Sequence, residues 1–132
     1  MIWFIDASII VAILGREDDW QAQSDRVDAA TTKLWSAITQ WESVAALKVR
    51  LAQPIEAVQT IFEDFQALNQ IDMVAIGADE TARAIDAHRR YGKGSGSRAK
   101  LNMGDCFAYA CAKTSGARLL YKGDDFTHTD LA

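Results

Sequence analysis

The sequence predicts an α/β fold built on a parallel β-sheet, and two apolar segments carry this prediction. Residues 2–5 are four consecutive large apolar residues, which is typical of a strand buried on both faces in the middle of a parallel sheet. Residues 117–121 form a second apolar run, which we expect to be the last strand. The 132 residues suffice for one globular domain with a sizeable core, so we expect a single domain over residues 1–132.

The segments between these two strands have mostly the apolar spacing of helices. Residues 54–68 are the clearest case, because apolar residues recur at helical intervals after Pro54, which is tolerated at a first helical position. Residues 31–35 give a weak strand signal and residues 71–76 a strong one. The other helices are expected at residues 8–15, 20–30, 38–51, 79–91 and 105–112.

Composition and charge exclude several classes of protein. The net charge of −4 argues against general electrostatic attraction to nucleic acid or anionic membranes. The N-terminal apolar stretch is interrupted by Asp6 and ends at Gly15, so we expect neither export by that route nor a membrane-embedded segment. Cys106 and Cys111 form no CxxC pair, and with only two His in the chain they argue against a zinc site. Two free thiols fit a reducing cytoplasm.

Acidic residues occur at several places that lead to one edge of the predicted sheet. Asp6 directly follows the first strand, while Asp124 and Asp125 follow the last one. Ligands of open α/β sheets collect at the carboxyl ends of the strands. Glu42 and Asp105 are expected in the first turns of helices that run back from the same edge. Each acid also has a purely structural explanation, such as a helix N-cap for Asp6 or a partner of the helix dipole for Glu42.

Taken together, the acidic residues predict a metal site. Two carboxylates about 4 Å apart repel by roughly 4 kcal/mol at an effective dielectric constant of about 20, so a cluster of them needs a cation. Ligation by oxygen atoms alone, without His or Cys, selects a hard ion such as Mg²⁺ or Mn²⁺, which is typically shared with a phosphate. The acids therefore indicate phosphodiester or phosphoryl chemistry.

The chain has one basic stretch, which overlaps a segment rich in Gly and Ser. Residues 92–100 cannot hold regular structure, so we expect a mobile surface loop. This loop is either simply solvated or a strip that contacts phosphates beside the site. Its glycines lack the Gly-Lys-Ser/Thr ending of a phosphate-cradling P-loop. The candidate RNA contacts are Arg89, Arg90, Lys93, Arg98 and Lys100.

The order of these motifs resembles that of the PIN-domain ribonucleases, specifically the VapC-type toxins of prokaryotic toxin–antitoxin pairs. The resemblance covers essentially the whole chain. It implies a three-layer α/β/α sandwich around a short, mostly parallel sheet, Mg²⁺-dependent cleavage of RNA, homodimers, and inhibition by a small antitoxin. It rests on Asp6-Ala-Ser8, Glu42, Asn102-x-Gly-Asp105, and the runs Gly104-Asp-Cys-Phe-Ala-Tyr-Ala110 and Leu120-Tyr-Lys-Gly-Asp-Asp-Phe126.

The resemblance also assigns roles to individual residues. It makes Asp6, Glu42 and Asp105 the principal acids, with Ser8 and Asn102 in support. As a mechanism we expect metal-assisted hydrolysis of an RNA phosphodiester, in which Asp6 and Asp105 hold the cation. Glu42 and a fourth acid would complete the cage or orient the attacking water. The target RNA is not indicated, because the sequence lacks the aromatic-rich sheet motifs of single-strand RNA binders.

The fourth acid is Asp124 or Asp125, both of which are candidate metal ligands. Successive side chains of a strand point to opposite sides, so the two cannot both face one ion from regular strand geometry. Asp124 follows Gly123 and is well placed to cap the next turn with its side chain. We therefore prefer Asp125 as the fourth catalytic acid.

Two other functional classes remain open at this stage. A Mg²⁺-dependent phosphatase or phosphotransfer domain also places an Asp after its first strand, but it usually needs a second acid two residues on, where this chain has Ser8. A non-catalytic domain that only binds a partner would gain nothing from so many like charges.

Overall fold

The computed structural model describes all of residues 1–132 and contains four strands and six helices. The strands are β1 (Ile2–Ile5), β2 (Thr32–Ser36), β3 (Asp72–Val74) and β4 (Arg118–Leu120). The helices are α1 (Ala7–Leu14), α2 (Trp20–Ala29), α3 (Ala37–Leu51), α4 (Ile55–Asn69), α5 (Ala78–Tyr91) and α6 (Met103–Thr114).

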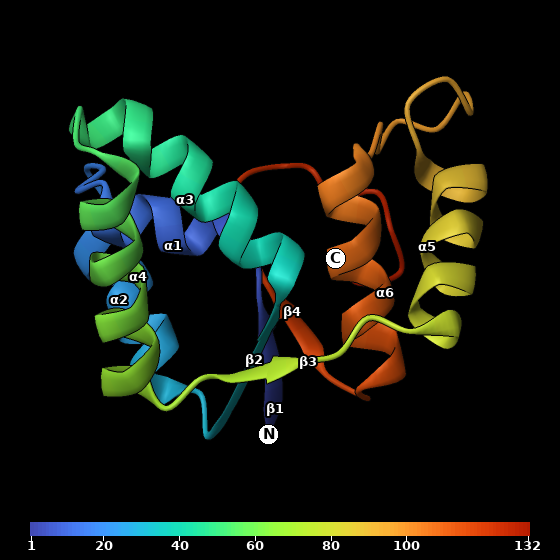
Figure 1. The fold of residues 1–132 in the computed structure, drawn as a ribbon. Helices are drawn as coiled ribbons and strands as arrows, with labels where there is room; N and C mark the ends of the chain where they lie inside the picture. Colours follow the sequence, from blue (N-terminus) through green and yellow to red (C-terminus); the bar gives the residue numbers. More distant parts are fainter.

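All four strands are parallel and lie in the order β3-β2-β1-β4. The first strand is central, since Phe4 pairs with Leu34 of β2 on one side and with Leu119 of β4 on the other. Helices α1 to α4 lie on one side of this sheet and helices α5 and α6 on the other (Figure 1). The predicted three-layer α/β/α sandwich around a parallel sheet is therefore confirmed.

Each face of the sheet has its own apolar core, because neighbouring residues of β1 point to opposite faces. Phe4 packs into the core beneath α5 and α6, whereas Ile5 packs into the core beneath α1, α2 and α4. In the second core the ring of Trp35 stacks on that of Phe62, with 4.3 Å between their centroids. In the first core the buried face of α6 consists mainly of small residues, which allow this helix to lie close to the sheet.

The structure corrects two sequence-based expectations about the elements. The strand expected at residues 71–76 is only Asp72–Val74, because β3 is an edge strand that pairs with β2 alone and exposes Asp72 and Met73. Pro54 lies at the N-cap of α4 and not at its first helical position.

The Gly-rich segment at residues 92–100 contains no helix or strand, as expected, and hydrogen bonds join its two ends. The Lys93 N–H donates to the Leu101 carbonyl (3.0 Å), and the Leu101 N–H donates to the Tyr91 carbonyl (2.8 Å). Ala99 within the segment is buried. These contacts close the segment into a turn and fix its ends beside the start of α6.

The structure also bears on the expectations about the cysteines and about membrane-spanning segments. Cys106 and Cys111 are both buried free thiols, as predicted. None of the helices combines the length and the apolar character that a bilayer-crossing segment requires.

Candidate active site

Asp6 lies at the end of β1, where its side chain is the N-cap of α1. Its Oδ2 atom accepts hydrogen bonds from the backbone N–H of Ser8 (3.0 Å) and from the Ser8 hydroxyl (2.6 Å). The Ser8 oxygen in turn accepts from the backbone N–H of Lys122, at 3.0 Å, beyond the end of β4. Ser8 therefore orients Asp6 and ties together the ends of two neighbouring strands. Because both bonds from Ser8 go to Oδ2, the Oδ1 atom of Asp6 is left for a ligand.

Asp105 is fixed in the same way at the start of α6. The Asn102 side chain accepts from the Asp105 N–H (2.9 Å), and Asp105 Oδ2 accepts from the Asn102 N–H (3.1 Å). This reciprocal pair is a capping box, which satisfies two backbone donors of the helix terminus. It also holds the carboxylate of Asp105 in one orientation. Asn102 is thus placed as a support for Asp105.

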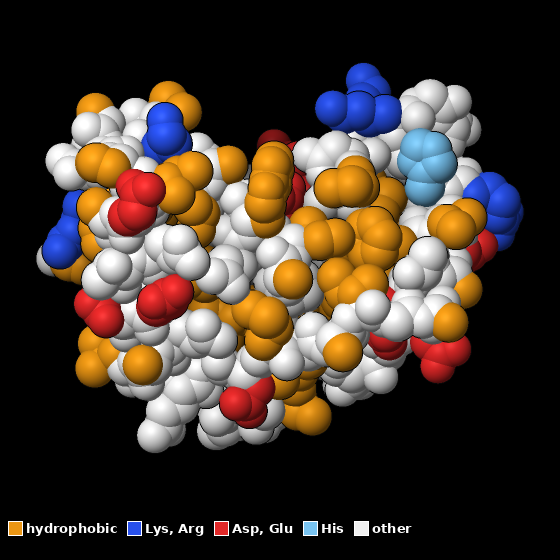
Figure 2. All heavy atoms as spheres, in the orientation of Figure 1, with side chains coloured by type: hydrophobic (Ala, Val, Ile, Leu, Met, Phe, Trp, Pro, Cys, Tyr) orange, Lys and Arg blue, Asp and Glu red, His pale blue; other side chains and the backbone are white.

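Glu42 lies opposite this helix terminus, in the second turn of α3. The expectation that it sits in a first turn is wrong, because α3 begins at Ala37, directly after β2. A partnership with the dipole of α3 therefore does not explain this acid. Its carboxylate lies against Gly104 in the first turn of α6. Figure 2 shows acidic side chains set back in the hollow between α3 and α6.

The charge of Asp125 acts on this cluster from beyond the end of β4. It is among the main causes that raise the pKa of Asp6 and that of Asp105. The expected side-chain cap by Asp124 is not formed, because the turn is closed by the Asp124 backbone carbonyl, which accepts from the Thr127 N–H (3.1 Å). A positive φ of 93° at Gly123 turns the chain at this point.

Burial and mutual repulsion raise the pKa values of the three principal acids. Burial is the largest cause in each case, and it raises the pKa of Glu42 to about 7 and that of Asp105 to about 6. The charges of Asp6 and Asp105 further raise the pKa of Glu42. The pKa of Asp6 is also raised, although its hydrogen bonds from Ser8 act in the opposite direction. The acids therefore form one coupled electrostatic group.

No three acidic, His or Cys side chains converge closely enough to form a ready-made cage for an ion. The donor set still fits a hard divalent cation, since it consists of carboxylate oxygens alone. The raised pKa values of Asp6, Glu42 and Asp105 arise from burial and like charge, and both are offset by a bound cation. Asp6 and Asp105 are the two acids whose orientation is already fixed by hydrogen bonds.

The structure separates the candidate RNA contacts into two groups. Arg89 and Arg90 pair with Asp86 of their own helix at 2.5 and 3.7 Å, so these two charges are partly neutralised. Lys93 acts on the acidic cluster directly, since its charge lowers the pKa of Asp105. Arg98 and Lys100 form no ion pair with an acid of the chain.

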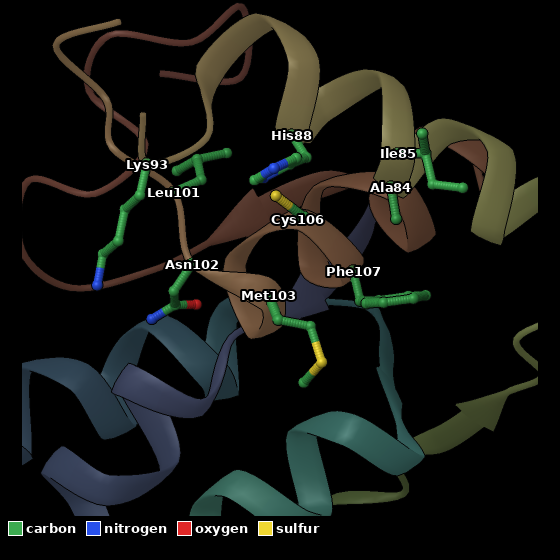
Figure 3. Close-up of a pocket in the computed structure, with 9 residues that line it drawn as sticks. All are labelled: Ala84, Ile85, His88, Lys93, Leu101, Asn102, Met103, Cys106 and Phe107. Atoms are coloured by element: carbon green, nitrogen blue, oxygen red, sulfur yellow. The ribbon is translucent and has the colours of Figure 1, made fainter. Parts of the chain in front are cut away.

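A cavity of about 430 Å³ lies between α5 and the start of α6, beside the acidic cluster. Its wall is mainly apolar, and Lys93 and Asn102 supply polar groups at one end (Figure 3). The other lining residues are Ala84, Ile85, His88, Leu101, Met103, Cys106 and Phe107. The polar end of this cavity therefore adjoins the residue that orients Asp105.

Sequence reasoning missed the side chain of Lys122. Its ammonium pairs with Glu17 and, at 2.8 Å, with Asp19, and it thereby joins the segment between α1 and α2 to the segment that carries Asp125. The position of Lys122 directly after an apolar run was the one sequence feature that could have indicated its role. Its partners Glu17 and Asp19 could not be recognised, because residues 16–19 look like an ordinary polar connection.

With this geometry established, the comparisons with known proteins identify the class of the chain. Residues 3–131 match the PIN domain. The chain is 42% identical to a VapC ribonuclease of Rhizobium meliloti, over 97% of this chain and 98% of that protein. It is 40% identical to ribonuclease VapC30 of Mycobacterium tuberculosis, over 97% of this chain and 95% of that protein. The chain therefore belongs to the PIN-domain family.

Within that family its relatives are VapC ribonucleases, and the chain is accordingly a ribonuclease of the VapC type. The fold agrees with the crystal structure of VapC20 of Mycobacterium tuberculosis, a sarcin-ricin loop cleaving toxin (TM-score 0.75, 15% identity, 95% of this chain and 92% of that chain). It also agrees with a toxin–antitoxin complex from Klebsiella pneumoniae (TM-score 0.70, 17% identity, 97% and 92%). Ribonucleases of this type depend on a metal ion.

The raised pKa of Glu42 predicts that stability depends on pH. The folded chain keeps a proton on Glu42 up to about pH 7, whereas the unfolded chain loses it near the ordinary pKa of 4.5. The folded state therefore binds more protons between these values, and the free energy of unfolding falls as pH rises from about 4.5 to about 7. Urea unfolding in metal-free buffer at about pH 5 and about pH 8 measures this fall.

The variant Glu42→Gln is expected to reduce this fall, because it removes the group that titrates. Glu63→Gln, on the exposed face of α4, is the matched control and should keep the wild-type dependence. An equal dependence on pH in Glu42→Gln and wild type would contradict the assignment.

Proposed function

We propose that this ribonuclease is the toxin of a toxin–antitoxin pair and that it hydrolyses RNA phosphodiester bonds with Mg²⁺ held by Asp6 and Asp105. The observation that carries the proposal is the matched support of these two acids. Each carboxylate is fixed through Oδ2 by hydrogen bonds, from Ser8 or from Asn102. The ligands of a metal site are oriented by neighbouring residues that form hydrogen bonds with them. Mn²⁺ has the same ligand preference and is an alternative ion.

The four acids then have distinct roles in hydrolysis. When bound, the cation supplies Lewis-acid stabilisation of the phosphate and a lowered pKa for bound water. Asp6 and Asp105 position it, and the charge of Asp125 adds to the negative field of this pair. Glu42 accepts a proton from the attacking water, since its carboxylate lies against the start of α6 and is kept ionised near neutral pH by a bound cation.

The basic residues beside the site are proposed to bind the RNA backbone. Lys93 is the first candidate, because it lines the cavity at the start of α6 and its charge lowers the pKa of Asp105. Arg98 and Lys100 in the same turn are without acidic partners, so their charges remain available to phosphates. Arg89 and Arg90 would contribute less, since Asp86 pairs with both.

Substitution of Asp6 and Asp105, the two acids held by hydrogen bonds, tests this proposal directly. Asp6→Asn and Asp105→Asn should each lower RNA cleavage in Mg²⁺ by at least about 100-fold, since each removes a ligand of the ion. Cleavage of a labelled RNA measures the effect, and a phosphomonoester serves as a second substrate that should not react. The control Asp64→Asn, at an exposed position of α4, should cleave at the wild-type rate. Wild-type cleavage by either site variant would remove that residue from the site.

A second test separates the two adjacent acids after β4. Asp125→Asn should weaken the activation of cleavage by Mg²⁺ far more than Asp124→Asn, because the charge of Asp125 is among the main causes that raise the pKa values of Asp6 and Asp105. The rate of RNA cleavage is measured against Mg²⁺ concentration for each variant. The reverse ranking would assign the fourth acid to Asp124.

The proposed partner is a small antitoxin protein. The toxin–antitoxin complex from Klebsiella pneumoniae and VapBC2 from Rickettsia felis, crystallised with a promoter DNA fragment (TM-score 0.72, 16% identity, 99% and 95% coverage), support this partner through the shared fold. An acidic crevice suits an inserted Arg, which can take the place of the cation with bidentate carboxylate bonds.

Expression of the chain alone is expected to arrest bacterial growth, and co-expression of the short neighbouring gene product should restore it. Growth curves of a host that carries inducible copies of both genes provide the measurement. The Asp6→Asn variant is the control and should not arrest growth. If the neighbouring product leaves the arrest unchanged, the proposed partner is wrong.

We also propose that the chain forms a homodimer, that residues 1–132 are one nuclease domain, and that it acts in the cytoplasm. Two buried free thiols support a reducing compartment. Exposed apolar side chains on three helices support the dimer, since Trp41, Ile85 and Met103 are 70%, 66% and 62% exposed. Light scattering on the purified chain should give twice the mass of one chain. Trp41→Glu should give a single chain, and a wild-type monomer would contradict the dimer.

A further inference from the structure

Gly104 is the second residue of α6, between the cap Asn102 and the metal-ligand candidate Asp105. Its backbone has ordinary helical geometry, without the positive φ that would call for glycine. Alanine is favoured over glycine inside a helix. The buried Gly104 therefore needs a different explanation.

The explanation lies in the space that a side chain would fill. A Cβ atom added at Gly104 would lie 2.0 Å from Glu42 Oε2 and 2.4 Å from both Oε1 and the carboxyl carbon. These three nearest atoms all belong to one carboxylate of another helix. At Gly92, by contrast, the nearest atoms include the backbone of its own helix. The space at Gly104 is thus taken by the functional group of Glu42.

We propose that Gly104 is a positioning residue for RNA hydrolysis. Because Gly104 has no side chain, the Glu42 carboxylate has room to lie against the first turn of α6, beside Asp105. The proposal rests on the proposed role of the acidic cluster and adds the residue that leaves room for the Glu42 carboxylate at the start of α6. No hydrogen bond of the chain holds the Glu42 carboxylate, in contrast to Asp6 and Asp105. The space beside the bare backbone of Gly104 is therefore what allows this carboxylate to lie at the start of α6.

A methyl group at position 104 would displace the Glu42 carboxylate from the space beside the Gly104 backbone. A displacement of about 1 Å at a reacting group can reduce a rate by about 100-fold. Shortening the acid to Asp withdraws the carboxylate by one methylene and makes room for the methyl group. Removing the carboxylate with Glu42→Ala abolishes the conflict entirely. The contact can thus be tested by combining Gly104→Ala with changes at residue 42.

The experiment introduces Gly104→Ala into three backgrounds: wild type, Glu42→Asp and Glu42→Ala. RNA cleavage, the metal-free melting temperature and the calorimetric affinity for Mg²⁺ are measured for each pair. In the wild-type background, the change should lower cleavage by about 10-fold to 100-fold, because it displaces the Glu42 carboxylate, and it should change the melting temperature less favourably than it does in the Glu42→Ala background. In the Glu42→Asp background it should reduce cleavage by less than about 2-fold, because the shorter acid leaves room. In the Glu42→Ala background it should leave the Mg²⁺ affinity unchanged and raise or maintain the melting temperature.

The matched control is Gly77→Ala at the N-cap of α5. A Cβ atom there would meet only Glu80 Oε1, at an ordinary 3.5 Å, so this change should leave cleavage and the Mg²⁺ affinity unaltered. Equal effects of Gly104→Ala in all three backgrounds, or wild-type cleavage by Gly104→Ala alone, would overturn the proposal. If Gly104→Ala does not fold, folding of the Glu42→Ala, Gly104→Ala pair supports it, and failure of that pair to fold overturns it. The melting and Mg²⁺ measurements need no RNA, so they separate this proposal from the proposed function.

Discussion

Repulsion among carboxylates at the carboxyl edge of a parallel sheet is the constraint on which this structure depends. Asp6 and Asp125 follow neighbouring strands, and Glu42 and Asp105 approach from helices on opposite sides of the sheet. Burial makes each negative charge more costly, and the raised pKa values of Asp6, Glu42 and Asp105 record that cost. Local hydrogen bonds hold this arrangement in place.

These hydrogen bonds serve the fold and the site together. The bond from Ser8 to Asp6 starts α1, and the bond from Lys122 to Ser8 fixes the end of β4. The capping box of Asn102 and Asp105 starts α6. A structural N-cap and a metal ligand are therefore compatible roles for one carboxylate, because its two oxygen atoms can serve them separately.

The fold was predictable because burial leaves a clear pattern in the sequence. The two-sided burial of β1 produced an apolar run, and the crossover helices produced helical spacing. The exposed edge strand β3 was predicted too long, since apolar residues on either side of it belong to connections. The acids could be named from their positions after strands and near helix starts, and their catalytic roles stay predictions. The contact of Glu42 with Gly104 and the ion pairs of Lys122 could not be derived, because they join elements whose relative placement only the fold defines.

The melting temperature with and without a divalent cation tests the central claim most directly. If the acids repel one another until a cation binds, the wild-type chain should melt at a higher temperature in excess Mg²⁺ than in a chelator. Binding at a concentration of about 100 times Kd would stabilise it by about 2.7 kcal/mol. The doubly substituted chain with Asp6→Asn and Asp105→Asn should melt above wild type in the chelator and gain nothing from Mg²⁺. A wild-type chain that is indifferent to Mg²⁺, together with a substituted chain that melts lower in the chelator, would contradict the account.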